Sequence, residues 1–298
     1  MARDLSVIIV NWNAGGLLRD CVESVYRETL KYSPQVIIVD NASSDDSVAR
    51  VEKEFPEAVI IKNAANLGFA KGNNIGVEAA EGRYVVLLNP DARVTDRALD
   101  KLCGFLESAG AETGAAGPVL LNGDGSFQTQ QGSRFPTLGT AFSQYLFLGR
   151  ILGLPGIFMN RAPSSDGPRR VDWLCGACLA CETEVYRQAG GLDEKFFLYA
   201  EDMDFCYRLG EKGLSSFILP AAKVIHVSKR STSQQGEEIS KYQVESLKEF
   251  FRTKNPSWKF TVFKGILFIG LAARFLALSL VSREKARSIR VLLKYVYS

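Results

Sequence analysis

Residues 6–13 read Ser-Val-Ile-Ile-Val-Asn-Trp-Asn, a β-branched run that ends in a tryptophan between two amides. Short apolar runs followed by polar residues recur at 35–41, 58–66 and 84–91. The segments between them repeat apolar positions at helical spacing, which is typical of amphipathic helices. Strand and helix therefore alternate. This order predicts an α/β fold in which helices flank a mostly parallel central sheet.

Polar residues stand where each predicted strand ends. They are Asn11 and Asn13, then Asp40 and Asn41, then Asn63 to Asn66, and last Asn89 to Asp91. In open α/β sheets, ligands bind outside the carboxyl ends of the strands. We therefore expect these four strand ends to gather on one edge of the sheet and to form the binding site.

Composition excludes several classes of protein. The chain has 298 residues, of which 46% are hydrophobic and 23% charged, as in an ordinary globular protein and unlike disordered or collagenous chains. Residues 251–298 hold ten Lys or Arg against one acid, whereas residues 1–250 hold 26 basic against 32 acidic residues, a balance of −6. An acidic body disfavours nucleic acid as a partner. A basic tail interleaved with aromatic residues favours an anionic membrane surface.

The cysteines and the start of the chain bear on the cellular compartment. No charged leader, apolar core or small-residue cleavage site precedes the first apolar run, so we interpret the chain as cytoplasmic and its six cysteines as reduced. Cys175, Cys178 and Cys181 form C-x2-C-x2-C, but the fourth ligand of an iron–sulfur run is missing at its spacing. The other interpretation is a set of small buried side chains. A strand would send thiols three residues apart to opposite faces.

Phosphate-binding loops of the common nucleotide-binding folds are missing. There is no G-x-x-x-x-G-K-[ST] sequence, and Asn11 to Gly16 after the first run do not form G-x-G-x-x-G. This disfavours kinase-type and dinucleotide sites. A nucleotidyltransferase is disfavoured too, because no Gly-rich loop bearing Arg or Lys lies near the N-terminus. The acids and amides present suit hydrogen bonds to a base and ribose, with a carboxylate that can hold a divalent cation.

Two residues are candidate ligands of a cation. Asp91 follows a fully apolar strand and a proline, where a fixed carboxylate can hold Mg²⁺ or Mn²⁺ against a diphosphate; the alternative is a turn residue that caps a helix near Thr95. His226 is the only histidine and ends another predicted strand, so it is either a metal ligand that would favour Mn²⁺ or a structural side chain. Lys229 and Arg230 either bind phosphate or belong to a solvated loop.

An acidic sequence, Glu201-Asp202-Met203-Asp204, opens a predicted helix. The helix dipole explains such acids as a plain N-terminal cap, and the same dipole would keep Asp202 ionised near neutral pH, as a general base requires. Asp204 and Arg208 are four residues apart, and we expect them to pair on the helix surface.

Together these motifs resemble the inverting family 2 glycosyltransferases, which have the GT-A fold. The resemblance covers residues 5–235 and is closest to the bacterial rhamnosyltransferase branch that builds O-antigen and other cell-surface polysaccharides. The motifs that carry it are residues 7–13, 39–45, 66–74, 88–91, Gly176-Ala177, 190–197, 199–204, Arg208 and His226.

The resemblance implies roles for single residues. Asp202 would be the catalytic base, with Glu201 beside it contacting sugar hydroxyls, and Asp91 with His226 would hold the metal, Mg²⁺ or Mn²⁺. The pattern Asn89-Pro90-Asp91 offers one carboxylate where the family has a D-x-D-type acid. The nucleotide-sugar donor would contact Asn11, Asn13, Asp40, Asn41, Asn66, Gly68, Asn73, Asn89, Lys229 and Arg230. Trp173 would either stack on an acceptor sugar or pack in the core.

The implied reaction is metal-dependent, inverting transfer of one sugar, rhamnose from dTDP-rhamnose, to a lipid-linked glycan. A UDP-sugar donor is an alternative within this mechanism, and an inactive sugar-nucleotide or membrane scaffold is an alternative outside it. The sequence Gln131-Gly132-Ser133-Arg134-Phe135 imitates Q-x-x-R-W of processive synthases, but it precedes Asp202 instead of following it. We therefore expect a non-processive enzyme.

We expect two domains. Residues 1–236 would form the GT-A catalytic domain, with a nucleotide-binding half over 1–100 and an acceptor half over 101–236; residues 237–298 would be helical. Lys264 and Arg274 interrupt the apolar run of 258–281 and fall on one side of a helix with Lys259. This predicts an in-plane helix at the inner face of the cytoplasmic membrane, with contacts over 258–294. The alternatives are packing on the catalytic body and a homodimer.

Overall fold

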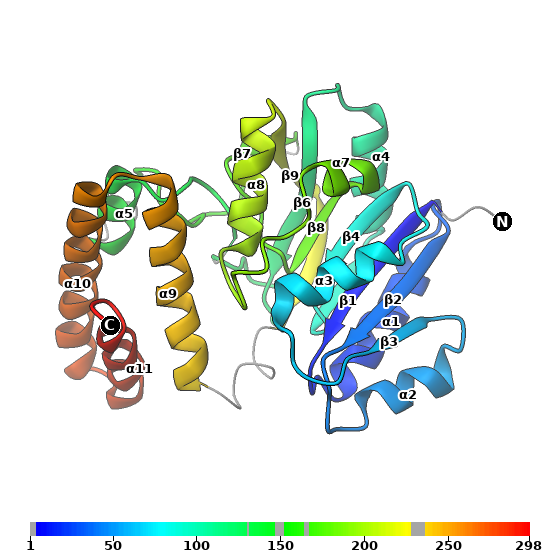
Figure 1. Ribbon diagram of the computed structural model, residues 1–298, viewed down its shortest axis with the longest axis horizontal. Coiled ribbons are helices and arrows are strands. Elements are labelled where there is room, and N and C mark those ends of the chain that lie inside the picture. Colours follow the sequence, from blue (N-terminus) through cyan, green and yellow to red (C-terminus); the bar gives the residue numbers. More distant parts are fainter. Residues whose placement is uncertain (1–3, 130, 147–151, 164–166, 228–235) are drawn as a thin grey trace.

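A computed structural model of the chain describes residues 4–129, 131–146, 152–163, 167–227 and 236–298 (Figure 1). The strands are β1 (Leu5–Asn11), β2 (Pro34–Asp40), β3 (Val59–Lys62), β4 (Tyr84–Leu88), β5 (Ala92–Thr95), β6 (Thr113–Leu121), β7 (Arg169–Val171), β8 (Cys178–Glu182) and β9 (Ser215–His226). The helices are α1 (Gly16–Glu28), α2 (Ser47–Glu54), α3 (Gly68–Glu78), α4 (Ala98–Ser108), α5 (Leu138–Tyr145), α7 (Thr183–Gln188), α8 (Glu201–Glu211), α9 (Gly236–Lys254), α10 (Ser257–Ser279) and α11 (Arg283–Lys294).

One mixed sheet runs through the described residues in the order β3-β2-β1-β4-β8-β6-β9-β5, with β7 paired to β9. The strands β1 to β4 are parallel, as predicted, and β8 joins β4 in the antiparallel direction. Val7 and Ile9 belong to one buried cluster, and Ile8 between them belongs to the other. Both faces of the sheet are therefore covered, which is why the strands read as continuous apolar runs.

Helices divide between the two faces. The cluster of Val7 and Ile9 includes side chains of α1 and α4, such as Leu18 and Leu99, while that of Ile8 includes Val77 of α3 and Phe205 of α8. The loops that follow β1, β2 and β4 emerge between these layers at one edge. This arrangement confirms the predicted α/β fold.

Strand β6 lies in the segment 104–170, where weak periodicity favours long loops and does not indicate a strand. The structure nevertheless places β6 inside the sheet between β8 and β9. Gly117 of β6 lies so close to Leu174 and Cys178 that a side chain there would press on both. Pro118 coincides with a shift in the β6–β9 register, as expected for a residue without a backbone donor.

The cysteine pattern is resolved by the strand geometry. Cys178 and Cys181 both lie on β8, and they belong to the two different buried clusters. The prediction that thiols three residues apart face opposite sides is confirmed. Burial raises the pKa of the Cys175 thiol to about 12 and raises the thiol pKa values of Cys178 and Cys181 further, which fits small core side chains.

The C-terminal helices α9, α10 and α11 gather at one end of the molecule, with α5 beside α10 (Figure 1). Phe251 of α9 stacks on Phe263 of α10 with ring centroids 4.0 Å apart, and both belong to the cluster that also covers the sheet. The expectation that helices begin near residue 237 is confirmed. The C-terminal segment packs on the catalytic body.

The basic side chains of α10 are partly buried and make contacts with neighbouring groups. The Arg274 guanidinium donates to Gln144 O of α5 at 2.8 Å and lies over the Tyr145 ring. Lys264 lies over the rings of Phe260 and Tyr297. Aromatic rings and a carbonyl therefore lie against both charges, and the predicted in-plane orientation of α10 stays a prediction.

Candidate functional site

The ends of β1 and β2 place Asn11 opposite Asp40 in the parallel register. Both side chains are buried, and Asn11 Nδ2 donates to Asp40 Oδ1 at 2.8 Å. Asp40 Oδ2 also accepts from the backbone N–H of Ser43 at 3.1 Å. The carboxylate of Asp40 is therefore held in one orientation at the sheet edge, as recognition of a base or ribose requires.

Asn13 and Asn41 shape the loops around this pair. Asn13 adopts a left-handed φ of 52°, and its Oδ1 accepts from the backbone N–H of Ser44 at 2.7 Å. Asn41 Nδ2 donates to Asn66 Oδ1 at 3.2 Å and to Gly68 O at 3.0 Å. The structure brings together the residues of these three loops that were predicted to contact the nucleotide-sugar. The side-chain amides of Asn13 and Asn41 form hydrogen bonds within the loops.

Gly68 and Asn73 lie on α3. Gly68 has a φ of 83°, and a Cβ there would come within 2.5 Å of Phe197 O, so only glycine fits. Asn73 is buried and donates to Phe69 O one helical turn earlier at 2.9 Å. Asn73 thus braces the helix from within, and Gly68 permits the close approach of the 193–200 loop.

A second cluster forms where β4 and β9 end. His226 pairs in register with Ala92, next to Asp91, and His226 Nε2 lies 3.2 Å from Asp91 Oδ1 and 3.0 Å from Asn89 Nδ2. His226 Nδ1 lies 2.9 Å from Gln128 Oε1. The two predicted metal ligands, 135 positions apart in the sequence, are adjacent in the fold.

Hydrogen bonding at Gln128 indicates the tautomer of His226. Gln128 Nε2 donates to His226 O at 3.3 Å, so its Oε1 is the atom that faces the ring and accepts from Nδ1–H. The lone pair of His226 Nε2 then points toward Asn89 Nδ2, a donor, and toward the Asp91 carboxylate. A lone pair and a carboxylate attract only when a proton or a cation lies between them.

This donor set fits a divalent cation. Within the described ranges, no group of three or more His, Cys, Asp or Glu side chains forms a metal cage, so Asp91 and His226 would supply two ligands. Cations that act on diphosphates are commonly held by one or two protein ligands together with phosphate oxygens and water. An imidazole in the set favours Mn²⁺.

A third cluster forms at the start of α8. Asp202 is 9% exposed; its Oδ2 accepts from the Gly176 N–H at 2.7 Å, and its Oδ1 accepts from the Met203 N–H at 2.7 Å. Burial raises the pKa of Asp202 to about 6, against the opposing effect of these two N–H donors. Burial thus outweighs the dipole that we expected to dominate, but Asp202 is still ionised at neutral pH.

Glu201, 3% exposed, is the second acid of this cluster. Burial, and then the charge of Asp202, raise the pKa of Glu201 well above its usual range. Its Oε2 has no hydrogen-bond partner among the described residues. Two neighbouring acids with different environments divide into one neutral and one ionised group, which is the arrangement that acid–base chemistry uses.

Asp204 behaves differently from the prediction. It pairs with Arg208 as expected, at 2.7 Å, but it is buried rather than on the helix surface. Its other oxygen lies 3.1 Å from Lys254 Nζ of α9. Asp204 therefore joins the helix that carries Asp202 to the C-terminal helices.

Trp173 is 4% exposed, and its indole N–H donates to Arg134 O and Ile157 O, each at 3.1 Å. This environment corresponds to the core-packing alternative, because a face open to a sugar would need exposed ring area. Gln131 is buried and bonds to the backbone of Leu120, a structural role. Lys229 and Arg230 lie outside the described residues.

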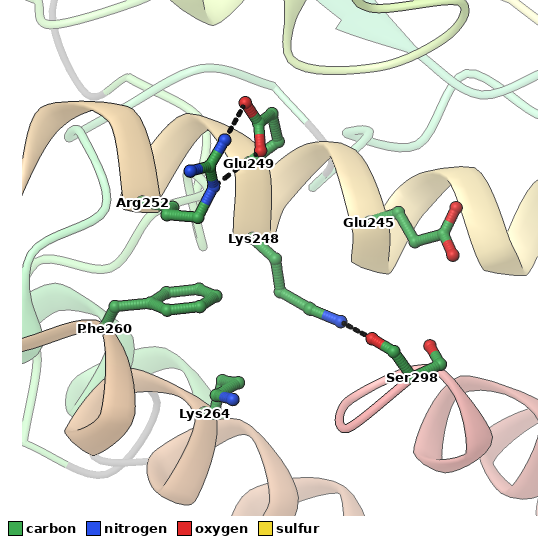
Figure 2. Close-up of a pocket in the computed structure, with 7 residues that line it drawn as sticks. All are labelled: Glu245, Lys248, Glu249, Arg252, Phe260, Lys264 and Ser298. Atoms are coloured by element: carbon green, nitrogen blue, oxygen red, sulfur yellow. Dashed lines mark hydrogen bonds and ion pairs between the residues drawn. The ribbon is translucent and has the colours of Figure 1, made fainter. Parts of the chain in front are cut away.

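A cavity of about 300 Å³ lies away from these clusters, between α9, α10 and the last residues of the chain (Figure 2). Lys248 points into it, and its Nζ donates to Ser298 O at 3.0 Å and to Tyr295 O at 2.8 Å. Glu249 and Arg252 on its rim pair with each other. The cavity belongs to the helical assembly, and no residue of the sheet edge lines it.

Sequence reasoning missed Gln128 and the Gly176 N–H. Gln128 lies in a segment without periodicity, 98 residues from His226, and nothing in its neighbours signals the contact. The backbone donor of Gly176 carries no side-chain signature. The motif Gly176-Ala177 pointed to this turn without indicating what it does.

Comparison with known proteins bears on this geometry. Residues 6–165, just over half of the chain, match the family described as Glycosyl transferase family 2. The chain is 27% identical to the N-acetylglucosaminyl-diphospho-decaprenol L-rhamnosyltransferase of Mycobacterium tuberculosis over 85% of this chain and 86% of that protein.

Two solved structures resemble the fold. The mannosyltransferase PcManGT from Pyrobaculum calidifontis, in complex with GDP-Man and Mn²⁺, superposes with a TM-score of 0.58 and 16% identity, over 100% of this chain and 86% of that one. GalNAc-T7 with UDP, GalNAc and Mn²⁺ superposes with a TM-score of 0.58 and 18% identity, over 81% of this chain and 47% of that one. Both are similar in fold.

Proposed function

We propose, from the premise that the chain belongs to glycosyl transferase family 2 and is a GT-A glycosyltransferase, that it transfers one rhamnose residue from dTDP-rhamnose to a lipid-linked glycan. The donor sugar and acceptor class are supported by the M. tuberculosis relative, whose name states both a rhamnosyl transfer and a decaprenol-linked substrate. The single observation that carries the catalytic part is the buried Asp202, whose pKa of about 6 suits a base at neutral pH.

Asp202 takes the proton from an acceptor hydroxyl, and that oxygen attacks the anomeric carbon of the donor. The bond from this carbon to the diphosphate oxygen breaks in the same displacement, so the configuration inverts. The Gly176 and Met203 N–H groups hold the carboxylate in place. Because both amides stabilise the ionised form, they keep Asp202 able to accept a proton in a buried site.

Glu201 stays protonated beside Asp202 and offers a hydrogen-bond donor to a sugar hydroxyl. Its neutral state keeps a second negative charge away from the attacking oxygen. The Asp40 carboxylate, fixed by Asn11 and Ser43, receives the N–H of the base or a ribose hydroxyl. Asn66 and Gly68 shape the loop on the ribose side, and Asn89 orients His226.

Asp91 and His226 would hold a divalent cation, Mg²⁺ or Mn²⁺, whose charge offsets the charge that develops on the departing diphosphate. Lys229 and Arg230 are proposed to assist at the phosphates. Residues 1–236 form the catalytic domain of this proposal, in the cytoplasm at the inner face of the membrane. Transfer of a single residue follows from the position of the Gln131 motif ahead of Asp202.

Thermal unfolding with a panel of dTDP-rhamnose, UDP-sugars, GDP and CDP, with and without Mn²⁺, tests the donor. A ligand present at about 100 times its Kd adds about 2.7 kcal/mol to the free energy of unfolding. We expect stabilisation by dTDP-rhamnose with Mn²⁺ that Asp91→Ala abolishes and that Asp96→Ala, an exposed acid nearby, retains. Preference for a UDP-sugar would replace the donor, and no response to any nucleotide would favour the scaffold alternative.

A further inference from the structure

We propose that one face of α10 rests on an anionic lipid surface, with the helix lying in the membrane plane. The face consists of Trp258, Val262, Ile269, Leu276 and Leu280, here called the α10 stripe. At 100° per residue these five positions fall within about 40° of one another. The α10 stripe is a feature of the protein surface, and its role at a membrane would be the same whichever sugar is transferred.

Exposed apolar side chains are concentrated in the C-terminal part of the described residues. Thirteen large hydrophobic side chains are exposed; two of them, Leu30 and Val59, lie in residues 1–100, and seven lie between 258 and 281. Within the stripe, Trp258 is 62% exposed and Leu280 is 89% exposed. Such a concentration on one helix marks an interaction surface, since scattered single side chains are the norm elsewhere.

Helix α10 is apolar on two opposite faces, whereas an ordinary surface helix is apolar only on its buried face. Phe263, Leu267 and Leu271 are buried on the side opposite the stripe, so the helix already has a packed apolar face. Lys264 and Arg274, each about 140° from the centre of the stripe, are directed at neighbouring rings and a carbonyl. A helix whose outer face lies in water would carry charged side chains, and not the α10 stripe, on that face.

The bilayer is the occupant that the size and packing of α10 favour. By length and composition, the 23-residue α10 is the one described helix that could cross a membrane. Its buried face is committed to α5, α9 and α11, and the exposed charges of α9 and α11 would have to enter the hydrocarbon if α10 crossed. The remaining geometry is a helix that lies in the interface, with an amphipathic tryptophan at one end.

Charge distinguishes lipid from a second copy of the chain. Residues 251–298 carry a balance of +9, and Arg287 and Arg290 are exposed on α11 just beyond the Leu280–Val281 turn. Two such segments brought face to face would repel each other, whereas anionic headgroups complement them. The acidic balance of residues 1–250 would keep the rest of the molecule away from the same membrane.

Vesicle co-sedimentation of the full chain tests this proposal. We expect binding to vesicles of phosphatidylcholine with phosphatidylglycerol, weaker binding to phosphatidylcholine alone, and loss of binding at high salt. The double variant Ile269→Glu with Leu276→Glu should reduce binding about tenfold or more. Leu30→Glu is the matched control, since Leu30 is 62% exposed on the opposite part of the molecule, and it should bind as the unmodified protein does.

Tryptophan emission gives a second readout that does not depend on folding losses. Of the three tryptophans, Trp258 is exposed, Trp12 is partly buried and Trp173 is buried, so lipid contact at Trp258 should shift the emission to shorter wavelength in the unmodified protein and much less in Trp258→Phe. Equal vesicle binding by the double variant would overturn the proposal. A dimer in solution that the same substitutions dissociate, without any vesicle binding, would overturn it in favour of a second copy. Stabilisation by dTDP-rhamnose in the double variant separates this outcome from failure of the proposed donor.

Discussion

Replacing Gln128 with leucine tests how the proposed metal ligand His226 is held. Gln128 Oε1 lies 2.9 Å from His226 Nδ1 and fixes the tautomer whose Nε2 lone pair faces Asp91. Leucine leaves the Nδ1–H of a largely buried ring without this acceptor, and an unsatisfied buried donor costs about 1–3 kcal/mol. Loss of such a partner behind a metal ligand typically lowers metal affinity about 10- to 100-fold, or about 1.4–2.8 kcal/mol.

Electron paramagnetic resonance of free Mn²⁺ measures this affinity directly, in the presence of dTDP and without turnover. We expect Gln128→Leu to weaken Mn²⁺ binding within that range and Gln128→Glu, which keeps an acceptor at the same place, to restore most of it. Gln188→Leu, on the exposed surface of α7, is the control. Unchanged Mn²⁺ binding by a folded Gln128→Leu variant, or failure of the glutamate to rescue it, would refute this account of His226.

Three further predictions concern the base, the buried ion pairs and the close approach at α3. The proposed base Asp202 acts in its ionised form, so kcat/KM should fall about tenfold per pH unit as the pH drops below about 6. Asp202→Asn should abolish turnover and spare nucleotide binding. A kcat/KM that stays constant down to about pH 5 would exclude this base. Asp204→Ala should lower the free energy of unfolding in urea by about 3 kcal/mol, because it removes the buried carboxylate that pairs with the partly buried cations Arg208 and Lys254. Asp96→Ala, in an exposed pair, should lower it by less than about 1 kcal/mol, and equal losses would contradict the burial argument. Gly68→Ala should destabilise more than Gly125→Ala in the same assay, since both have a φ near 80° and only Gly68 lacks room for a Cβ; similar effects would show that φ alone matters.

Much of the structure of residues 1–100 could be predicted because local pattern and topology agree there. Parallel strands buried on both faces read as continuous β-branched runs, and their carboxyl ends must meet at one edge, so Asn11 next to Asp40 follows from the order of elements. Asp91 and His226 were each ambiguous alone. They came together because their strands end at the same place, which only the antiparallel β5–β9 pairing shows.

Other features depend on tertiary contacts that leave no local trace. Strand β6 is rich in Gly, Ala and Pro because it fits tightly between neighbours, and this composition imitates a loop. The direction of Lys264 and Arg274 depends on where α5 and α11 pack, which helical periodicity alone does not determine. The pKa of Asp202 reflects burial that a helix N-terminus does not reveal.

The buried Asp204 fixes the distance between the proposed base and the C-terminal helices. It pairs with Arg208 on its own helix and with Lys254 on α9, so these ion pairs link the first turn of α8, with Asp202, to the C-terminal helices. With the α10 stripe on a lipid surface, the height of the base above that surface would be set by the fold. Acceptors would then be selected by the distance of their hydroxyl from the bilayer. A hydroxyl that lies too near the bilayer or too far from it would not reach Asp202, whichever sugar carries it.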